Sequence, residues 1–215
     1  MRKCYLSLVA VCLVVAAPVF AADLKSEISH PAPYNSGRVA FVCDDDLMDS
    51  AFYQDDVSAY GNAFDVGAGG PLSFIEFWHY GWFTLQGPYT YNLQVLDEAT
   101  CTSIGVVEGL EAADAFDHDE LEEEDLCAYG INVSGAIVVG VQSLSCASPG
   151  DCYPDVYMDF TAPVNECGRI VDLATGTGCD TPVQSSSGPV DFLLRITVDE
   201  CGGTPTQEGS WGSVK

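Results

Sequence analysis

The feature that most constrains the fold is an alternation of apolar and polar residues that recurs along the chain. It runs through 89–95, 155–160 and 191–198. A period of two residues is typical of strands that bury one face. No stretch after residue 21 keeps a helical period beyond two turns. The pattern therefore predicts an all-β protein.

About nine β-rich runs are separated by clusters of Gly, Pro, Asp and Ser. They cover 38–43, 62–66, 72–80, 89–95, 101–107, 136–141, 155–160, 169–173 and 191–198. Many connections are longer than a two-residue hairpin. This favours a jelly-roll-like antiparallel β-sandwich over an up-and-down meander. The acid-rich segment 108–125 has room for a short helix, but we expect a solvated loop there.

The first 21 residues have the pattern of a cleavable secretory signal peptide. Arg2 and Lys3 precede an apolar run from Leu6 to Val19, and Val19-Phe20-Ala21 offers a small-residue cleavage site. The apolar run is short for a membrane anchor, which is the alternative. We therefore expect a secreted protein, extracellular, periplasmic or at the cell surface, with no membrane insertion after cleavage.

Removing 21 of the 215 residues leaves 194, which suits one sizeable domain. We expect an N-terminal leader at 22–37 and a single β-sandwich domain at 38–201. Residues 202–215 form a polar tail without a strand pattern.

Eight cysteines remain after the signal peptide, and an even number in an exported chain predicts up to four disulfides. They are Cys43, Cys101, Cys127, Cys146, Cys152, Cys167, Cys179 and Cys201. Short loops favour pairing Cys146 with Cys152 and Cys167 with Cys179. Cys101 would then pair with Cys127, and Cys43 with Cys201. A metal-thiolate site is disfavoured because the chain has no C-x-x-C pair.

The charge balance limits the partners. After signal removal, five Lys and Arg stand against 32 Asp and Glu, a formal net charge of −27. Nucleic acid is excluded because binding its phosphates needs clustered basic residues. An anionic membrane surface is disfavoured for the same reason. Cations, neutral polymers such as extracellular glycans, and protein surfaces remain as partners, although solubility alone also explains the charge.

Three features together resemble the jelly-roll accessory domains of secreted bacterial proteins. They are the acidic turn Asp44-Asp45-Asp46 after the first strand, the Tyr-x-Leu-x-Val-x-Asp pattern at 91–97, and the closing Asp-Phe-Leu-Leu-Arg-Ile-Thr-Val strand. The resemblance covers about 38–201. Such domains more often begin Tyr-Asp-Asp-Gly, where this chain has Cys43 and Asp46. The resemblance implies a fold shared with carbohydrate-binding and adhesion modules.

No catalytic motif is evident. Gly-x-Ser-x-Gly and His-Glu-x-x-His are both absent. His30 lies in the leader, His79 in a strand and His118 among acids, which is a poor supply of general bases. With 32 carboxylates, a glycosidase-like pair carries no information. The sequence therefore favours a non-enzymatic protein for binding, adhesion or surface structure. A carbohydrate-binding module is the alternative, and a secreted hydrolase is third.

The aromatic segment 77–83 is the candidate ligand-binding site. Aromatic faces at a strand end can stack on sugar rings, although alternate aromatic residues of a strand usually fill the core. One of Phe77 and Trp78 must point inward. Tyr80 and Trp82, beside Gly81, are the expected exposed pair.

The candidate metal site is a Ca²⁺ site at Asp44, Asp45, Asp46 and Asp49. Ca²⁺ takes six to eight oxygen ligands, and these carboxylates gather where a strand ends. The acidic run 117–125 is denser, but a strand end fixes geometry better than a long loop. Neither segment matches an EF-hand loop. The alternative is that both are solvated turns.

A Ca²⁺ site makes the domain's stability depend on the ion. Millimolar Ca²⁺ should raise the melting temperature of the mature domain, because an ion that binds only the native state stabilises it. Mg²⁺ should do less, since it dehydrates reluctantly. Asp45→Asn combined with Asp46→Asn should remove the difference between the ions. Equal responses to both ions that survive the double substitution would indicate plain charge screening.

Overall fold

The computed structural model describes residues 28–29, 40–43, 47–51, 54–81, 85–116, 118–160, 166–185, 188–198 and 201. All pairings between strands in this part of the chain are antiparallel, and its one helical element is the 3-10 turn η1 (Cys127–Tyr129). None of the described helical segments is long and apolar enough to span a membrane. The all-β antiparallel prediction is confirmed, and the jelly-roll topology stays a prediction.

Five strands form the first main sheet. Its spatial order is β15 (Gly168–Asp172), β4 (Ser58–Asp65), β10 (Ala136–Ser143), β6 (Tyr89–Asp97) and β7 (Ser103–Ala112). Register shifts interrupt the pairing of β6 with β7 at two places. The edge strand β7 is therefore irregular, which discourages pairing with another chain.

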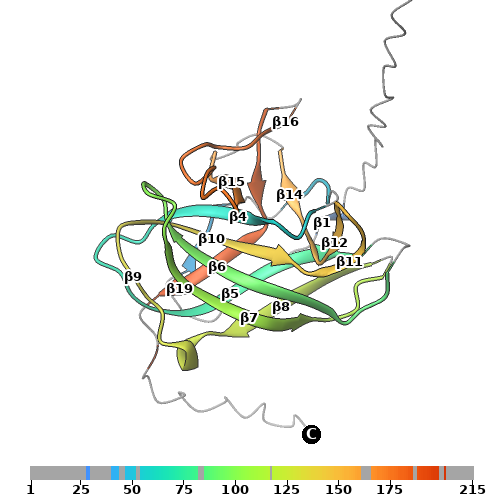
Figure 1. Ribbon diagram of the computed structural model, residues 1–215, viewed down its shortest axis with the longest axis horizontal. Coiled ribbons are helices and arrows are strands. Elements are labelled where there is room, and N and C mark those ends of the chain that lie inside the picture. The colour runs from blue at the N-terminus through green and yellow to red at the C-terminus, as the bar shows by residue number, and fades with distance from the viewer. Residues whose placement is uncertain are drawn as a thin grey trace, which may run out of the picture.

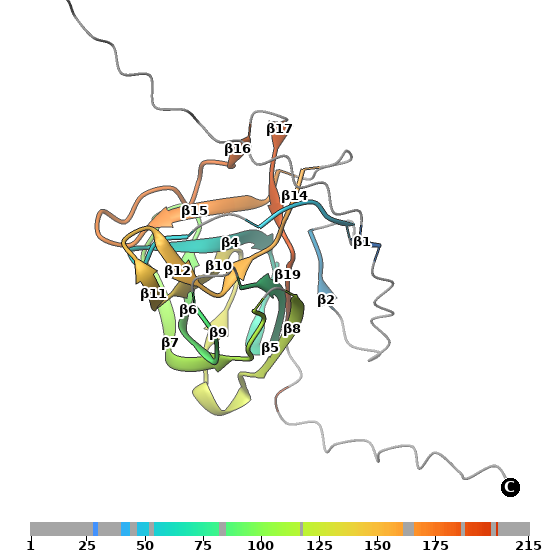
Figure 2. The same cartoon turned by 90° about the vertical axis from the view of Figure 1, so that its right-hand side faces the viewer.

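Six strands form the second sheet, which is built around the long strand β5 (Gly70–Tyr80). The path through it is β13 (Asp155–Val156), β5, β19 (Leu194–Val198) and β2 (Ala40–Phe41). Strands β8 (Asp119–Asp125) and β9 (Asn132–Val133) also pair with β5. The ribbons of the two sheets overlap in Figure 1, and in Figure 2 β6 and β7 of the first sheet lie opposite β5 and β8 of the second.

Four short strand pairs complete the described fold. They are β1 (Ile28–Ser29) with β3 (Leu47–Met48), β11 (Ser145–Ser148) with β12 (Asp151–Tyr153), β14 (Met158–Asp159) with β18 (Asp191–Phe192), and β16 (Gln184–Ser185) with β17 (Gly188–Pro189). The expected strand at 155–160 is therefore only the short β13 and β14. The expected strand at 191–198 is interrupted at Leu193, which separates β18 from β19.

Alternate residues of the two main sheets meet in one core. Leu93 and Val139 come from the first sheet, Ile75 and Ile196 from the second, and all are at most 1% exposed. Phe77 contacts Tyr91 across the core in an edge-to-face arrangement, with ring centroids 5.3 Å apart. The alternation that the sequence shows is therefore the alternation between core and outer face.

The expectation of a solvated loop at 108–125 is wrong. Residues 103–112 form β7, and the acidic run Asp119–Asp125 forms β8, which pairs residue by residue with β5. Acidic residues are poor strand formers, but pairing with a long neighbour overrides this weak preference. Strand β8 lies at a sheet edge, where charged side chains also discourage aggregation.

The eight cysteines pair as four disulfides, and one of the four expected pairs is confirmed. Cys146 pairs with Cys152 across the β11–β12 hairpin. The other three expected pairs are wrong, because the sheets bring together cysteines that lie far apart in sequence. The pairs found are Cys43 with Cys167, Cys101 with Cys179, and Cys127 with Cys201. Four disulfides fit an oxidising compartment outside the cytoplasm.

Asn62 connects the two main sheets through its side chain. It is fully buried on β4, and its Nδ2 donates to the carbonyl oxygens of Phe192 (2.6 Å) and Leu194 (3.1 Å). Its Oδ1 accepts the Phe192 N–H at 2.9 Å. These backbone groups lie at the break between β18 and β19. One amide therefore satisfies three buried backbone groups there.

We expect Asn62→Ala to lower the free energy of unfolding by about 3 kcal/mol, since each buried polar group left unsatisfied costs at least about 1 kcal/mol. Asn132→Ala is the matched control, because the exposed Asn132 side chain donates only to the nearby Gly130 carbonyl. Urea unfolding of the oxidised proteins measures both changes. Similar, small losses in the two variants would show that Asn62 does not connect the sheets energetically.

The disulfides should differ in their contribution to stability. The Cys43–Cys167 disulfide spans 124 residues and the Cys146–Cys152 disulfide spans six. If loop-closure entropy dominates, replacing the first pair with serine should cost about 5 kcal/mol and replacing the second about 2 kcal/mol. Denaturant unfolding of the two double variants tests this order, and a reversed order would contradict it.

Candidate functional site

The expected Ca²⁺ ligands are mostly outside the described residues. Asp44, Asp45 and Asp46 fall there, so the structure leaves the Ca²⁺ prediction open. Asp49 is described, and its Oδ2 accepts the backbone N–H of Phe160 at 2.8 Å. The backbone N–H of Asp49 donates to the Met158 carbonyl. Asp49 therefore joins the 47–51 segment to the end of β14.

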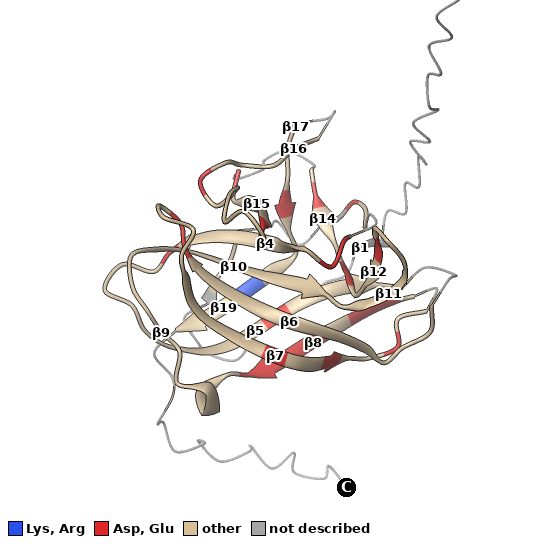
Figure 3. Cartoon of the chain, in the orientation of Figure 1, with Lys and Arg blue, Asp and Glu red and all other residues tan. Residues whose placement is uncertain are grey.

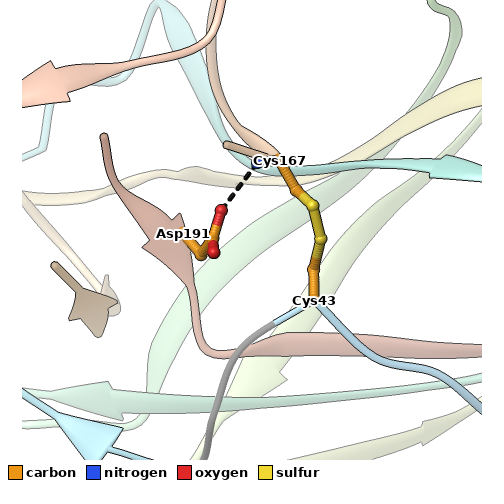
Figure 4. Close-up of side chains that lie close together, drawn as sticks. All are labelled: Cys43, Cys167 and Asp191. Atoms are coloured by element: carbon orange, nitrogen blue, oxygen red, sulfur yellow. Dashed lines mark hydrogen bonds between the residues drawn. A yellow bond between two sulfur atoms is a disulfide. The ribbon is translucent and has the colours of Figure 1, made fainter. Parts of the chain in front are cut away.

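Two described groups combine two cysteine sulfur atoms with a carboxylate oxygen, and the three atoms of each group lie within 4.8 Å of one another. One is Cys43, Cys167 and Asp191, shown in Figure 4, and the other is Asp56 with Cys146 and Cys152. In both groups the sulfur atoms are joined in disulfides and are not thiolate ligands. Asp191 Oδ1 instead accepts the backbone N–H of Cys167 at 2.6 Å. We therefore interpret both groups as structural.

Aromatic residues from two distant segments gather on the outer face of the six-stranded sheet. Phe77 and His79 point into the core, so Trp78 and Tyr80 of β5 point outward. Tyr157, which lies between β13 and β14, packs against Tyr80 with ring centroids 6.2 Å apart. We call Trp78, Tyr80 and Tyr157 the aromatic cluster.

Trp78 and Tyr80 are half-buried, and Tyr157 is 9% exposed. The Tyr157 hydroxyl donates to Asp119 Oδ1 at the start of β8. Burial, followed by this contact, raises the pKa of Tyr157, so the hydroxyl keeps its proton at neutral pH. The cluster therefore combines three rings with a carboxylate that is already oriented.

The sequence identified part of this cluster. Tyr80, expected to be exposed, lies on the outer face but is half-buried, and its role as a binding residue stays a prediction. Phe77 is the inward member of the Phe77–Trp78 pair. Trp82 falls outside the described residues. Tyr157 was missed because it lies 77 residues beyond Tyr80, and only the pairing of β13 with β5 brings it there. Its place in an alternating run was the sole signal in the sequence.

Both described basic residues are buried in ion pairs. Arg169 Nη2 lies 2.7 Å from Glu98 Oε1, and Arg195 Nη1 lies 3.4 Å from Glu76 Oε1. In Figure 3, acidic residues colour β8 and many loops, whereas blue appears on β19. The described surface therefore presents no Lys or Arg side chain that could bind an anion.

A second polar cluster lies on the inner face of β8. Glu120, Glu122 and Glu124 share this face because residues two apart in a strand point the same way. Glu124 Oε1 accepts the Tyr91 hydroxyl at 3.3 Å. Burial, and to a lesser degree repulsion from Glu122, raises the pKa of Glu124. His79 and His118 also contact this row of glutamates.

Comparison with known proteins finds no matching family model, no similar curated protein and no similar solved structure. The chemistry of the site therefore rests on this chain's own residues. The aromatic cluster offers ring faces and one carboxylate acceptor, a combination suited to binding.

Proposed function

We propose that the protein is a secreted, non-enzymatic binding module that contacts its partner through the aromatic cluster. The observation that carries this proposal is the position of Trp78, Tyr80 and Tyr157 on the outer face of a sheet, next to Asp119. Aromatic residues with a polar group are enriched where proteins bind partners. The disulfides and the signal-like N-terminus support an extracellular site of action.

The charge of the chain favours a partner without negative charge. After signal removal the formal net charge is −27, and this charge repels anionic polymers. Both described arginines form ion pairs with glutamates. A neutral polymer is not repelled by this charge. Its recognition also does not require a Lys or Arg side chain on the protein.

A neutral glycan is the partner class that the cluster favours. The apolar faces of sugar rings pack on aromatic rings, and sugar hydroxyls donate hydrogen bonds to carboxylates. Asp119 has one oxygen engaged by Tyr157, so its orientation is fixed before a ligand arrives. The alternative is adhesion to a protein partner. The third hypothesis is that the protein is a hydrolase that cleaves a glycan.

Retention on insoluble neutral polysaccharides tests the proposal. The mature oxidised protein should bind at least one of cellulose, chitin, xylan and starch. Trp78→Ala should weaken binding about 30-fold, as expected for a hot-spot aromatic residue that contributes about 2 kcal/mol. Tyr80→Ala should also weaken binding.

Tyr129→Ala is the matched control, because Tyr129 is 49% exposed on η1, outside the aromatic cluster. Melting temperatures of all variants separate lost binding from lost folding. Binding unchanged in folded Trp78→Ala and Tyr80→Ala would remove the cluster from the binding surface. Release of reducing sugar ends by the wild-type protein would replace the binding module with a hydrolase.

A further inference from the structure

The two tyrosines of the aromatic cluster are nearly perpendicular to each other. The planes of the Tyr80 and Tyr157 rings meet at 77°, and the ring centroids are 6.2 Å apart. A flat sugar ring packs on one ring face at a time, whereas two perpendicular faces can both contact one compact group. Each face carries the negative part of the aromatic quadrupole. The corner between these two rings is therefore suited to a compact cation.

A carboxylate lies beside this pair of rings. Asp119 on β8 is the cross-strand partner of Tyr80, and directly opposite residues of an antiparallel pair have Cβ atoms about 5 Å apart on the same face. The Tyr157 hydroxyl donates to Asp119 Oδ1. Asp119 is half-buried, so water screens its charge less than at an open surface. An ammonium group there would meet two ring faces and an opposite charge, whereas a neutral hydroxyl gains only a hydrogen bond.

The neighbouring part of the same face is also acidic. Glu123 is exposed on β8 and lies directly opposite Glu76 on β5. Arg195 is the described base of this sheet; it is 6% exposed, and its Nη1 lies 3.4 Å from Glu76 Oε1. The charge of Arg195 is therefore directed to Glu76. The formal net charge of −27 after signal removal adds a long-range attraction for cations.

We propose that the aromatic cluster selects, among glycans, those whose sugar rings carry ammonium groups. A polymer of glucosamine that is partly or fully free of N-acetyl groups has this chemistry. Its ring faces pack on Trp78, and an ammonium substituent lies between Tyr80 and Tyr157, beside Asp119. This inference rests on the proposed function, because it requires that the cluster binds a glycan, and it adds the charge of the preferred glycan.

The sugar ring separates this ligand from a cationic peptide. A pyranose ring is rigid and presents an apolar face to Trp78. A Lys side chain carries the same charge, but it must lose rotamer freedom when it is held in one place. Charge attraction alone would not separate the two ligands, so their comparison tests whether the rings take part.

Calorimetric titration with two tetrasaccharides tests the inference. One is tetra-glucosamine, and the other is its N-acetylated form, which has the same backbone without the charge. In mild acid, where the amines are protonated, the mature oxidised protein should bind the first about fivefold more tightly. About 1 kcal/mol of cation–π attraction gives this ratio. High salt should reduce the ratio, because it screens the attraction between exposed charges.

Two variants locate the preference. Asp119→Asn removes the charge but can still accept the Tyr157 hydroxyl, so the ratio should fall toward one while the N-acetylated form still binds. Glu108→Gln is the matched control, because it removes the same charge from an exposed position on β7 of the first sheet. This control should keep the fivefold ratio. Melting temperatures show whether each variant is folded.

Tetralysine, which carries charge without sugar rings, measures general attraction to an acidic protein. Tetralysine binding as tight as that of tetra-glucosamine, with both unchanged in Trp78→Ala, would overturn the inference. Equal binding of the two tetrasaccharides, unchanged in Asp119→Asn, would also overturn it but leave a neutral glycan as the partner. Binding of neither tetrasaccharide, with no retention on the insoluble polysaccharides, would remove the proposed function itself.

Discussion

The packing of the two sheets depends on the side chain of Asn62. The segment 191–194 leaves β18 and enters β19, and its backbone must change partners at Leu193. On the outer side, the Leu193 N–H and carbonyl bond to Tyr157 and Trp78. On the inner side, Asn62 bonds to Phe192 and Leu194. A single amide from the opposite sheet thus compensates for the break and fixes where the closing strand lies.

Some of the aspartates stabilise turns through their side chains. Five aspartates each accept a hydrogen bond from the backbone N–H two residues further on, the pattern of an Asx turn. They are Asp55, Asp65, Asp114, Asp125 and Asp172. Such bonds satisfy backbone groups that strands leave unpaired at their ends. Hydrogen bonds, chiefly from the Gly87 N–H to Asp114 and from Thr175 to Asp172, lower the pKa of these two carboxyl groups, which keeps them ionised in mild acid.

The aromatic cluster and the glutamate row of β8 both depend on the position of β5 between β8 and β13. The outer face of β5 receives Tyr157 from the β13 side and Asp119 from the β8 side. Its inner face carries His79 opposite the glutamates of β8. Because successive residues of a strand point to opposite faces, one strand serves two unrelated clusters.

The sequence by itself determined the all-β fold class. Period-two alternation depends on the nearest neighbours along a strand, so it can be read locally, and β6 lies where it occurs at 89–95. The alternating runs at 155–160 and 191–198 instead form short or divided strands. The even cysteine count likewise predicted disulfides. Strand β8 was missed because its seven residues include six acids, and its pairing with β5 overrides their weak strand preference.

Only the tertiary structure decided which distant residues meet. Three of the four disulfides join cysteines at least 74 residues apart, contrary to the expected short loops. Tyr157 reaches Tyr80, and His79 reaches Glu122, through strand pairings that local sequence does not encode. Pairing and register follow from how all the strands share one core. The composition of each site was therefore visible in the sequence, but its assembly depended on the order of strands in the sheets.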